Sequence, residues 1–286
     1  MRNNTIIQVE VTTKCNHDCL YCPRYLIDKV RTLGDITPEM ETLLIQRLSE
    51  LNDKPELTVS VSGFGEPTLY PGLMELICKI KAVSNASIRL NTNASRLHEI
   101  GNRVISSNCV DYLTLSLNLP TRELYQKYTQ THDYPKVIEN IKQFLTKKQD
   151  RKPDVSLRFI KTPDSMPHLE NAARYWERYL NKNDEVSVAE LSNWGGLVGE
   201  PTEPRKGPCR YLSHQAGKHL SITLDGYASI CCFSVAFRQD DPLVVGNIRN
   251  HSIEELLVLA KLRANEIRGS DVCEHCNASV WVREGE

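Results

Sequence analysis

The chain has 286 residues, with 35 lysines and arginines against 36 aspartates and glutamates, so its formal net charge is −1. This balance lacks the basic excess of nucleic-acid binders, and no apolar run approaches the roughly 18 residues of a membrane span. We therefore expect neither a nucleic-acid partner nor a membrane. Ten cysteines without a signal peptide predict a cytoplasmic protein whose clustered thiols hold metal rather than a disulfide scaffold.

Short apolar runs alternate with segments of helical period up to residue 191. We expect strands over 6–11, 57–61, 87–90, 111–117, 155–160 and 186–191, and helices over 38–51, 71–83, 95–106, 121–128, 135–148 and 168–180. Alternation at this spacing favours parallel strands joined by right-handed crossovers. Six units are fewer than the eight of a closed barrel, so residues 1–191 predict an α/β fold, a partial (β/α)6 TIM-like barrel.

After residue 191 the alternation ends. Residues 192–208 are rich in glycine and proline and indicate a linker. A hairpin around Asp225-Gly226 and a helix over 252–267 follow, the helix opening with a capping box of Ser252 and Glu255. Residues 209–286 carry half of the cysteines, so we expect a small α+β domain that a metal helps to stabilise.

Three cysteines, Cys15, Cys19 and Cys22, share the loop after the first expected strand. A [4Fe-4S] cluster normally takes four cysteine thiolates, so three in one loop would leave one iron open to an outside ligand. The alternative is a structural zinc with His17 as fourth ligand, but His17 lies inside the loop in poor geometry.

Residues 9–23, VEVTTKCNHDCLYCP, resemble the signature of the radical S-adenosylmethionine (SAM) superfamily. The resemblance implies a [4Fe-4S] cluster on Cys15, Cys19 and Cys22, with SAM chelating the open iron through its amino and carboxylate groups. It also implies reductive cleavage of SAM to methionine and a 5′-deoxyadenosyl radical, which abstracts a substrate hydrogen. Tyr21 matches the aromatic position near the adenine.

A glycine-rich turn, Gly63-Phe64-Gly65-Glu66-Pro67, follows the second expected strand. It matches the superfamily motif in which backbone groups and the glutamate, here Gly63, Gly65 and Glu66, meet the SAM amino group; a plain tight connection is the alternative. The resemblance further implies SAM ribose or carboxylate contacts from four strand-end residues, which could instead be caps and turns. These four are Asn91, Asn93, Ser116 and Asn118.

Four cysteines are spread over the C-terminal module: Cys209, Cys231, Cys273 and Cys276. Their spacing alone leaves zinc and iron–sulfur chemistry open. Their order around a hairpin and a helix resembles the auxiliary-cluster domain of radical SAM enzymes, in the short twitch form of the SPASM type. This implies a second, fully ligated [4Fe-4S] cluster.

Three cysteines are left over. Cys232 could replace Cys231 as a ligand, be a packed thiol, or donate a hydrogen atom as radical SAM epimerases require. Cys78 and Cys109 are expected to be structural.

Within the superfamily, the length and the single short auxiliary domain are most similar to those of dehydrogenases of the aminocyclitol 2-deoxy-scyllo-inosamine. This implies oxidation of a secondary alcohol of a sugar or aminocyclitol to a ketone, with the auxiliary cluster accepting an electron. A flavodoxin or ferredoxin-type protein would supply the reducing electron. The first strand begins too early for a preceding leader-recognition domain, which favours a small polar substrate over a peptide.

Two strand residues are candidates for substrate chemistry. Alternation could turn Arg158 into the barrel lumen, where it would contact the substrate or SAM; a structural ion pair is the alternative. Glu190 could accept the substrate proton. His219, Asp225 and Trp194 border the auxiliary module and are weaker candidates.

Two other functions fit these patterns. The first is a redox-neutral radical SAM epimerase of a sugar or peptide residue, with Cys232 as hydrogen-atom donor. The second, of another class, is a zinc-stabilised binding protein without catalysis.

Overall fold

The computed structural model describes residues 4–31, 33–54, 56–199, 209, 212, 215–233, 241–267 and 273–277. Residues 200–208 of the expected linker lie outside this part of the chain. Nine strands form one sheet in the order β6-β5-β4-β3-β2-β1-β7-β8-β9. Their bounds are β1 (Thr5–Val9), β2 (Leu57–Val61), β3 (Ser87–Thr92), β4 (Tyr112–Asn118), β5 (Asp154–Lys161), β6 (Glu185–Glu190), β7 (His219–Ile222), β8 (Tyr227–Ser229) and β9 (Val244–Asn247).

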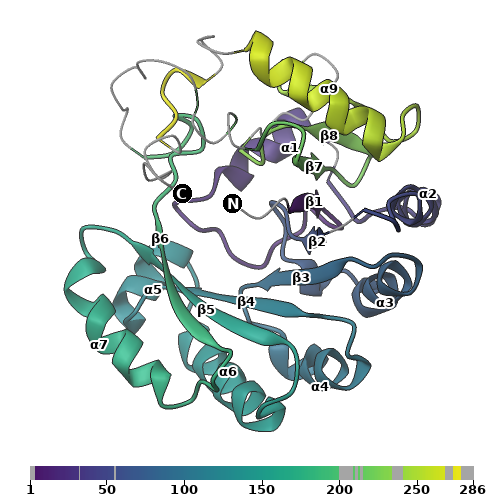
Figure 1. Ribbon diagram of the computed structural model, residues 1–286. Helices are drawn as coiled ribbons and strands as arrows, with labels where there is room; N and C mark the ends of the chain where they lie inside the picture. The colour runs from purple at the N-terminus through teal and green to yellow at the C-terminus, as the bar shows by residue number, and fades with distance from the viewer. Residues whose placement is uncertain are drawn as a thin grey trace.

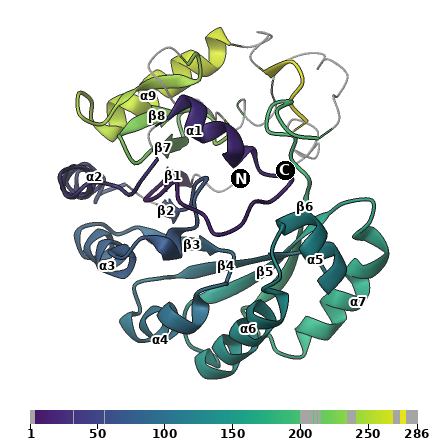
Figure 2. The ribbon, with the colours of Figure 1, turned by 180° about the vertical axis from the view of Figure 1, so that it is seen from behind.

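Strands β1 to β6 pair in parallel and curve into an open half-barrel (Figure 1). The helices are η1 (Pro23–Leu26), α1 (Ile27–Val30), α2 (Pro38–Ser49), η2 (Pro67–Leu69), α3 (Leu73–Val83), α4 (Leu97–Ser107), α5 (Arg122–Thr129), α6 (Tyr134–Lys148), α7 (Met166–Glu177) and α9 (Ile253–Glu266). Helices α2, α3, α4, α6 and α7 cover the outer face of the sheet in both the front and the rear view (Figure 2). The predicted partial barrel is confirmed. None of the helices described combines the length and the apolar character that crossing a membrane requires.

Strand alternation decides which side chains face the lumen. On β5, Val155, Leu157 and Phe159 are buried in the hydrophobic core. Arg158, between them, points to the opposite face and lines a cavity. Arg158 therefore faces the lumen, because successive side chains of a strand point to opposite faces.

The C-terminal hairpin does not stand apart from the barrel. Strand β7 pairs in parallel with β1, and β8 and β9 extend the same sheet in antiparallel fashion. The tight turn before β8 contains Gly226 at φ +90°, a left-handed conformation that glycine adopts without strain. Helix α9 begins with the predicted capping box of Ser252 and Glu255. Strand β9 was not expected from the sequence.

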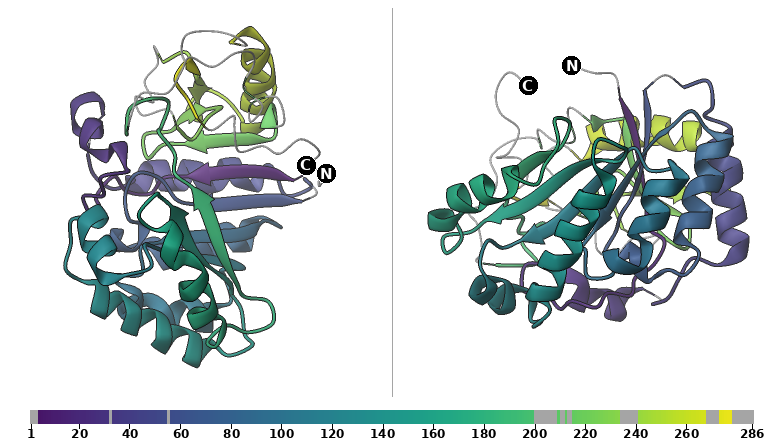
Figure 3. Two further views of the ribbon diagram at one scale, coloured as in Figure 1. Left: turned by 90° about the vertical axis from the view of Figure 1, so that its left-hand side faces the viewer. Right: turned by 90° about the horizontal axis from the view of Figure 1, so that it is seen from below.

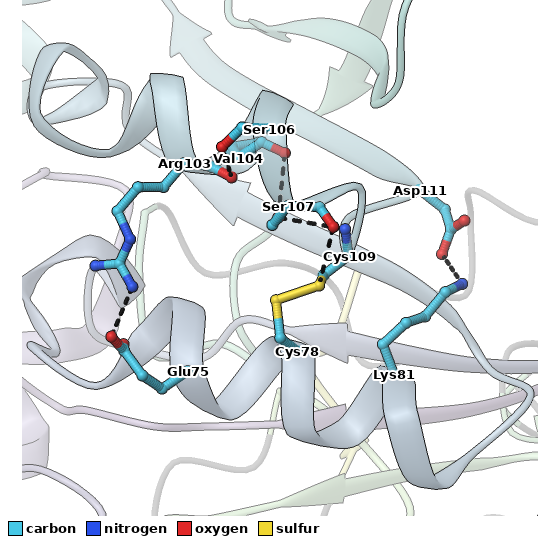
Figure 4. The surroundings of a disulfide bond; sticks show 9 residues. All are labelled: Glu75, Cys78, Lys81, Arg103, Val104, Ser106, Ser107, Cys109 and Asp111. Carbon is cyan, nitrogen blue, oxygen red and sulfur yellow. Dashed lines mark hydrogen bonds and ion pairs between the residues drawn. A yellow bond between two sulfur atoms is a disulfide. The ribbon is translucent and has the colours of Figure 1, made fainter.

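The structural cysteines Cys78 and Cys109 form a disulfide, which the sequence did not predict (Figure 4). Helix α3 packs beside the segment that precedes β4, so the two Cα atoms are 5.3 Å apart, within the usual range for a disulfide. Two ion pairs flank the bond: Glu75 with Arg103 at 2.6 Å, and Lys81 with Asp111, also at 2.6 Å. The disulfide therefore crosslinks α3 to the α4–β4 connection.

Candidate functional site

The cysteine loop leaves β1 and is fixed at the carboxyl end of the sheet. The purple segment containing α1 projects from that end in both views of Figure 3. The backbone N–H of Leu20 donates to the carbonyl of Tyr128 at 2.8 Å, and Asn16 Nδ2 donates to Ser95 Oγ at 2.8 Å. Elements that follow β3 and β4 therefore hold the loop in place.

The three thiols of the loop lie in an environment that disfavours their free thiolates. Burial raises the pKa of Cys19 to about 12 and that of Cys22 to about 11, and it raises the pKa of Cys15 as well. Backbone N–H groups of Asn16 and His17 donate toward the Cys15 sulfur and offset part of the effect. A metal cluster that binds thiolates would supply the compensating positive charge, and N–H···S bonds are typical of iron–sulfur ligands, so the loop fits such a cluster.

A single metal ion fits the described residues less well. In that part of the chain no group of three His, Cys, Asp or Glu side chains is arranged around one metal ion, as a structural zinc would need. A cubane instead binds each thiolate on a separate iron, which keeps the sulfur atoms apart. Within the loop, His17 Nε2 contacts Asp133 Oδ2 at 3.1 Å rather than the thiols.

The two glycines of the Gly63–Pro67 turn are required by close packing. A Cβ on Gly65 would lie 2.2 Å from the carbonyl oxygen of Thr12 and 2.7 Å from that of Lys14. A Cβ on Gly63 would lie 2.6 Å from Cγ of Glu10. The turn therefore rests directly on the cysteine loop and on the end of β1.

Glu66 is buried and binds the chain itself. Its Oε1 accepts from the N–H and the hydroxyl of Thr68 and from the hydroxyl of Thr92. Its Oε2 accepts from the backbone N–H of Asn93 at 2.7 Å. Glu66 thus fixes the end of β3 next to the turn.

Two of the other predicted SAM-contact residues bind the cysteine loop directly. Asn118 Nδ2 donates to the Tyr21 hydroxyl at 2.9 Å, and Asn93 Nδ2 donates to Asn16 Oδ1 at 2.9 Å. Ser116 lies beside Arg158 in the β4–β5 register. Asn91 Oδ1 is buried and accepts no hydrogen bond from the described residues.

A cavity of about 260 Å³ lies between these motifs and the C-terminal module. It brings together residues that are far apart in the sequence: Gly63 and Asn91 from the barrel, Arg158 from β5, Trp194 after β6 and Cys232 after β8. The remaining lining residues are Gln8, Glu10, Ser62, Phe64, Ser221, Ile222 and Thr223. His219 and Asp225 are not among the lining residues.

Arg158 presents a half-buried cation to this cavity. Burial lowers the pKa of its guanidinium, and the nearby charge of Arg89 lowers it further. The ion pairs and hydrogen bonds found among the described residues do not include one from Arg158, so the structural ion pair considered as an alternative is not observed there. A guanidinium in this position can bind hydroxyl or carboxylate oxygens.

Glu190 is not brought to the cavity. Lys161 lies three residues after Arg158 on β5 and so faces the other side of the sheet, and Glu190 is its register partner on β6. The two form an ion pair at 3.0 Å with half of the Glu190 side chain exposed. The carboxylate that does line the cavity is Glu10, at the carboxyl end of β1, which was not among the predicted site residues.

The C-terminal cysteines also approach one another. Cys231 is buried, and burial together with the neighbouring Cys232, Cys273 and Cys276 raises its pKa well above the ordinary value. The backbone N–H of Cys276 donates to the carbonyl of Cys273 at 3.1 Å in a tight turn. Cys209 is half-buried against the core. As in the cysteine loop, a cationic group nearby is needed before these thiols can all be ionised.

Both cysteine-containing parts of the chain match models of known protein families. Residues 9–165 match the family model of the radical SAM superfamily, and residues 209–277 match that of an iron–sulfur cluster-binding domain. The first match covers the cysteine loop and strands β2 to β5. The second covers all four predicted auxiliary ligands.

Two curated relatives are probable GTP 3′,8-cyclases. That of Methanocaldococcus jannaschii is 29% identical over 139 residues, which are 49% of this chain and 45% of the relative. That of Sulfurisphaera tokodaii is 27% identical over 192 residues, 65% of this chain and 55% of the relative. The chain thus spans about half the length of the curated relatives it matches.

Solved structures share the fold. The crystal structure of BtrN in complex with AdoMet and 2-DOIA has a TM-score of 0.56 at 18% identity and covers 96% of this chain and 93% of that one. SuiB of Streptococcus suis bound to precursor peptide SuiA has a TM-score of 0.64 at 14% identity, covering 89% and 64%. At such identities the likeness shows the fold alone.

Proposed function

This chain belongs to the radical SAM superfamily, uses SAM and [4Fe-4S] clusters, and on that premise we propose that it oxidises a secondary alcohol of a sugar or aminocyclitol to a ketone. Cys15, Cys19 and Cys22 would hold the cluster that binds SAM. The four C-terminal ligands proposed for the second cluster are Cys209, Cys231, Cys273 and Cys276. Membership of this family argues against the zinc-stabilised binding protein.

The observation that carries the proposal is the cavity between the two cysteine sites, which Gly63 and Asn91 line on one side and Cys232 on the other. When bound, the clusters and SAM supply an electron for SAM cleavage, a 5′-deoxyadenosyl radical for hydrogen abstraction and an acceptor for the electron that the substrate loses. The alcohol carbon gives up a hydrogen atom, and its hydroxyl group then gives up a proton and one electron. The product is a ketone two hydrogens lighter.

The chain's own residues bind the substrate and take the proton. We assign substrate hydroxyl or SAM carboxylate binding to the guanidinium of Arg158 and to Asn91 Oδ1, because both are polar groups in the cavity wall and Asn91 Oδ1 has no hydrogen-bond partner among the described residues. We assign the proton to Glu10, the carboxylate of the wall, which a buried ion pair with Arg31 keeps ionised before the substrate loses its proton. Ser62, Ser221 and Thr223 add hydroxyl groups to the wall, which suits a polyol.

The cavity volume favours a small substrate. About 260 Å³ lies at the lower end of ligand pockets, which are typically about 300–1,000 Å³. One six-membered polyol ring fits this scale better than a peptide. A peptide substrate is the alternative, since the SuiB structure holds a precursor peptide.

One observation favours a second reaction. Cys232 lines the same cavity, so its thiol is placed to return a hydrogen atom to a substrate radical. That reaction would be a redox-neutral epimerisation of a sugar or peptide residue. The two reactions use the same site and differ in whether the substrate loses an electron.

Product mass separates the two reactions. The anaerobically reconstituted enzyme is incubated with dithionite, SAM and a panel of sugars and aminocyclitols that includes 2-deoxy-scyllo-inosamine, in heavy water. The proposal expects a product two hydrogens lighter. A product of unchanged skeleton that gains one deuterium at carbon, and that disappears in Cys232→Ala, would support the epimerase instead. Cys15→Ala removes one proposed ligand of the cluster that binds SAM. It is the negative control, and we expect it not to cleave SAM.

A further inference from the structure

The segment after β6 binds the C-terminal cysteine pair to the barrel. Asn193 and Asn277 exchange two hydrogen bonds, each backbone N–H donating to the other's Oδ1 at 3.0 Å. Asn193 Nδ2 also donates to the carbonyl of His275 at 2.5 Å, and Asn277 Nδ2 donates to the carbonyl of Leu191 at 2.9 Å. Four hydrogen bonds thus fix residues that flank and separate Cys273 and Cys276. Asn193 is itself buried.

Trp194, the next residue, contacts all three parts of the site. Its indole Nε1 donates to the backbone carbonyl of Tyr21 in the cysteine loop at 2.9 Å. Its ring lies 5.3 Å from that of Phe64 in the glycine-rich turn and 5.1 Å from that of Phe233, which follows Cys232. Trp194 also lines the cavity. One side chain thus touches the loop of the first site, the turn and the second module.

We propose that Asn193, Trp194 and Asn277 are positioning residues that set where the auxiliary cluster sits relative to the substrate cavity, so that hydrogen abstraction leads to oxidation. This rests on the proposed function. Cys231 and Cys232 come one residue after the end of strand β8, which belongs to the sheet. Cys273 and Cys276 come after α9 instead, and their neighbours reach the barrel through the Asn193–Asn277 bonds. Together with the packing of Cys273 in the core, these bonds therefore fix where half of the ligand set lies.

Electron transfer from the substrate depends on this placement, because its rate falls as the distance between the substrate and the accepting cluster grows. Asn277→Ala removes the acceptor for Asn193 N–H and the donor to Leu191. Trp194→Ala removes the contacts with both Phe64 and Phe233. Neither change touches a cysteine ligand.

The test measures the two events separately in the reconstituted enzyme. In Asn277→Ala and Trp194→Ala we expect both clusters to be retained, at about eight irons per chain. In Asn277→Ala, SAM cleavage should stay within about twofold of wild type, while ketone formed per 5′-deoxyadenosine falls roughly tenfold. Trp194→Ala also loses the hydrogen bond to Tyr21 of the cysteine loop, so only its ratio of ketone to 5′-deoxyadenosine is compared with wild type. Trp194→Phe, which keeps an aromatic ring, should recover most of the coupling. Trp176→Phe, a buried tryptophan of α7 outside the cavity, is the matched control without effect.

A second readout needs no substrate. The electron paramagnetic resonance spectrum of the reduced auxiliary cluster should change in Asn277→Ala and stay unchanged in Trp176→Phe. It therefore tests the positioning role even when the oxidation proposal fails. The proposal is overturned if Asn277→Ala loses iron and SAM cleavage together, which would show a general folding role. An unchanged spectrum with unchanged coupling in both Asn277→Ala and Trp194→Ala would also overturn it.

Discussion

Replacing Arg31 with methionine should destabilise the protein strongly, because the carboxylate of Glu10 would lose its partner in the interior. The two side chains form an ion pair where the cysteine loop returns to β1, with 2% of the Arg31 side chain and 6% of the Glu10 side chain exposed. Glu10 Oε1 also accepts from the backbone N–H of Phe64 at 3.2 Å. That single long hydrogen bond cannot replace a guanidinium.

The expected magnitude follows from the burial. Removing one partner of a buried ion pair costs about 3–5 kcal/mol of unfolding free energy. At this chain length about 2 °C of melting temperature is lost per kcal/mol, so Arg31→Met should melt about 6–10 °C below wild type. The double variant Glu10→Gln, Arg31→Met removes both charges and should recover more than half of the loss.

Circular dichroism melts of the anaerobically reconstituted proteins measure these differences. The set comprises wild type, both single variants, the double variant, and Arg122→Met as a control that removes an exposed guanidinium on α5. The reasoning is refuted if Arg31→Met loses less than about 2 °C, or if the double variant loses as much as the two single variants together.

Three further predictions concern other parts of the chain. Gly65→Ala should lower iron incorporation and SAM cleavage together, because its Cβ would meet the Thr12 carbonyl at 2.2 Å; iron analysis and 5′-deoxyadenosine assays check this. Burial lowers the pKa of His219 to about 4, so the unfolded chain takes up the proton first as the pH falls. Above about pH 6.5 His219 leaves the free energy of unfolding unchanged, and this free energy should fall by about 3 kcal/mol as the pH is lowered to 4. Thermal melts of His219→Gln at several pH values should show a weaker pH dependence. Cys78→Ser should cost up to about 4 kcal/mol by opening a crosslink across 31 residues, and dithiothreitol should lower the melting temperature of wild type but not of this variant.

The elements of the barrel could be predicted because each depends on local pattern. Strand β2 has the predicted bounds, Leu57–Val61, and the other five barrel strands overlap their predicted ranges. The pairing of β7 with β1 could not be predicted, because it joins residues about two hundred positions apart and no periodicity encodes a partner. The disulfide between Cys78 and Cys109 could not be predicted for the same reason, because helix and loop patterns do not show which surfaces pack together.

The site was predictable where a strand has one buried face. Arg158 sits on β5 between buried residues, so alternation placed it in the lumen. Strand β6 is an edge strand whose side chains are all partly or fully exposed, so alternation there defined no face and Glu190 was misplaced. Glu10 had a usable signal: it follows the inward-facing Gln8 by two residues at the end of β1.

The central claim is that the substrate loses a carbon-bound hydrogen to SAM and one further electron. The most direct measurement uses an alcohol substrate deuterated at the carbinol carbon, with 5′-deoxyadenosine and product quantified in one anaerobic turnover. The account predicts one deuterium in 5′-deoxyadenosine for each ketone formed. Deuterated 5′-deoxyadenosine accompanied by a product that keeps its alcohol and takes up solvent hydrogen at that carbon would contradict it.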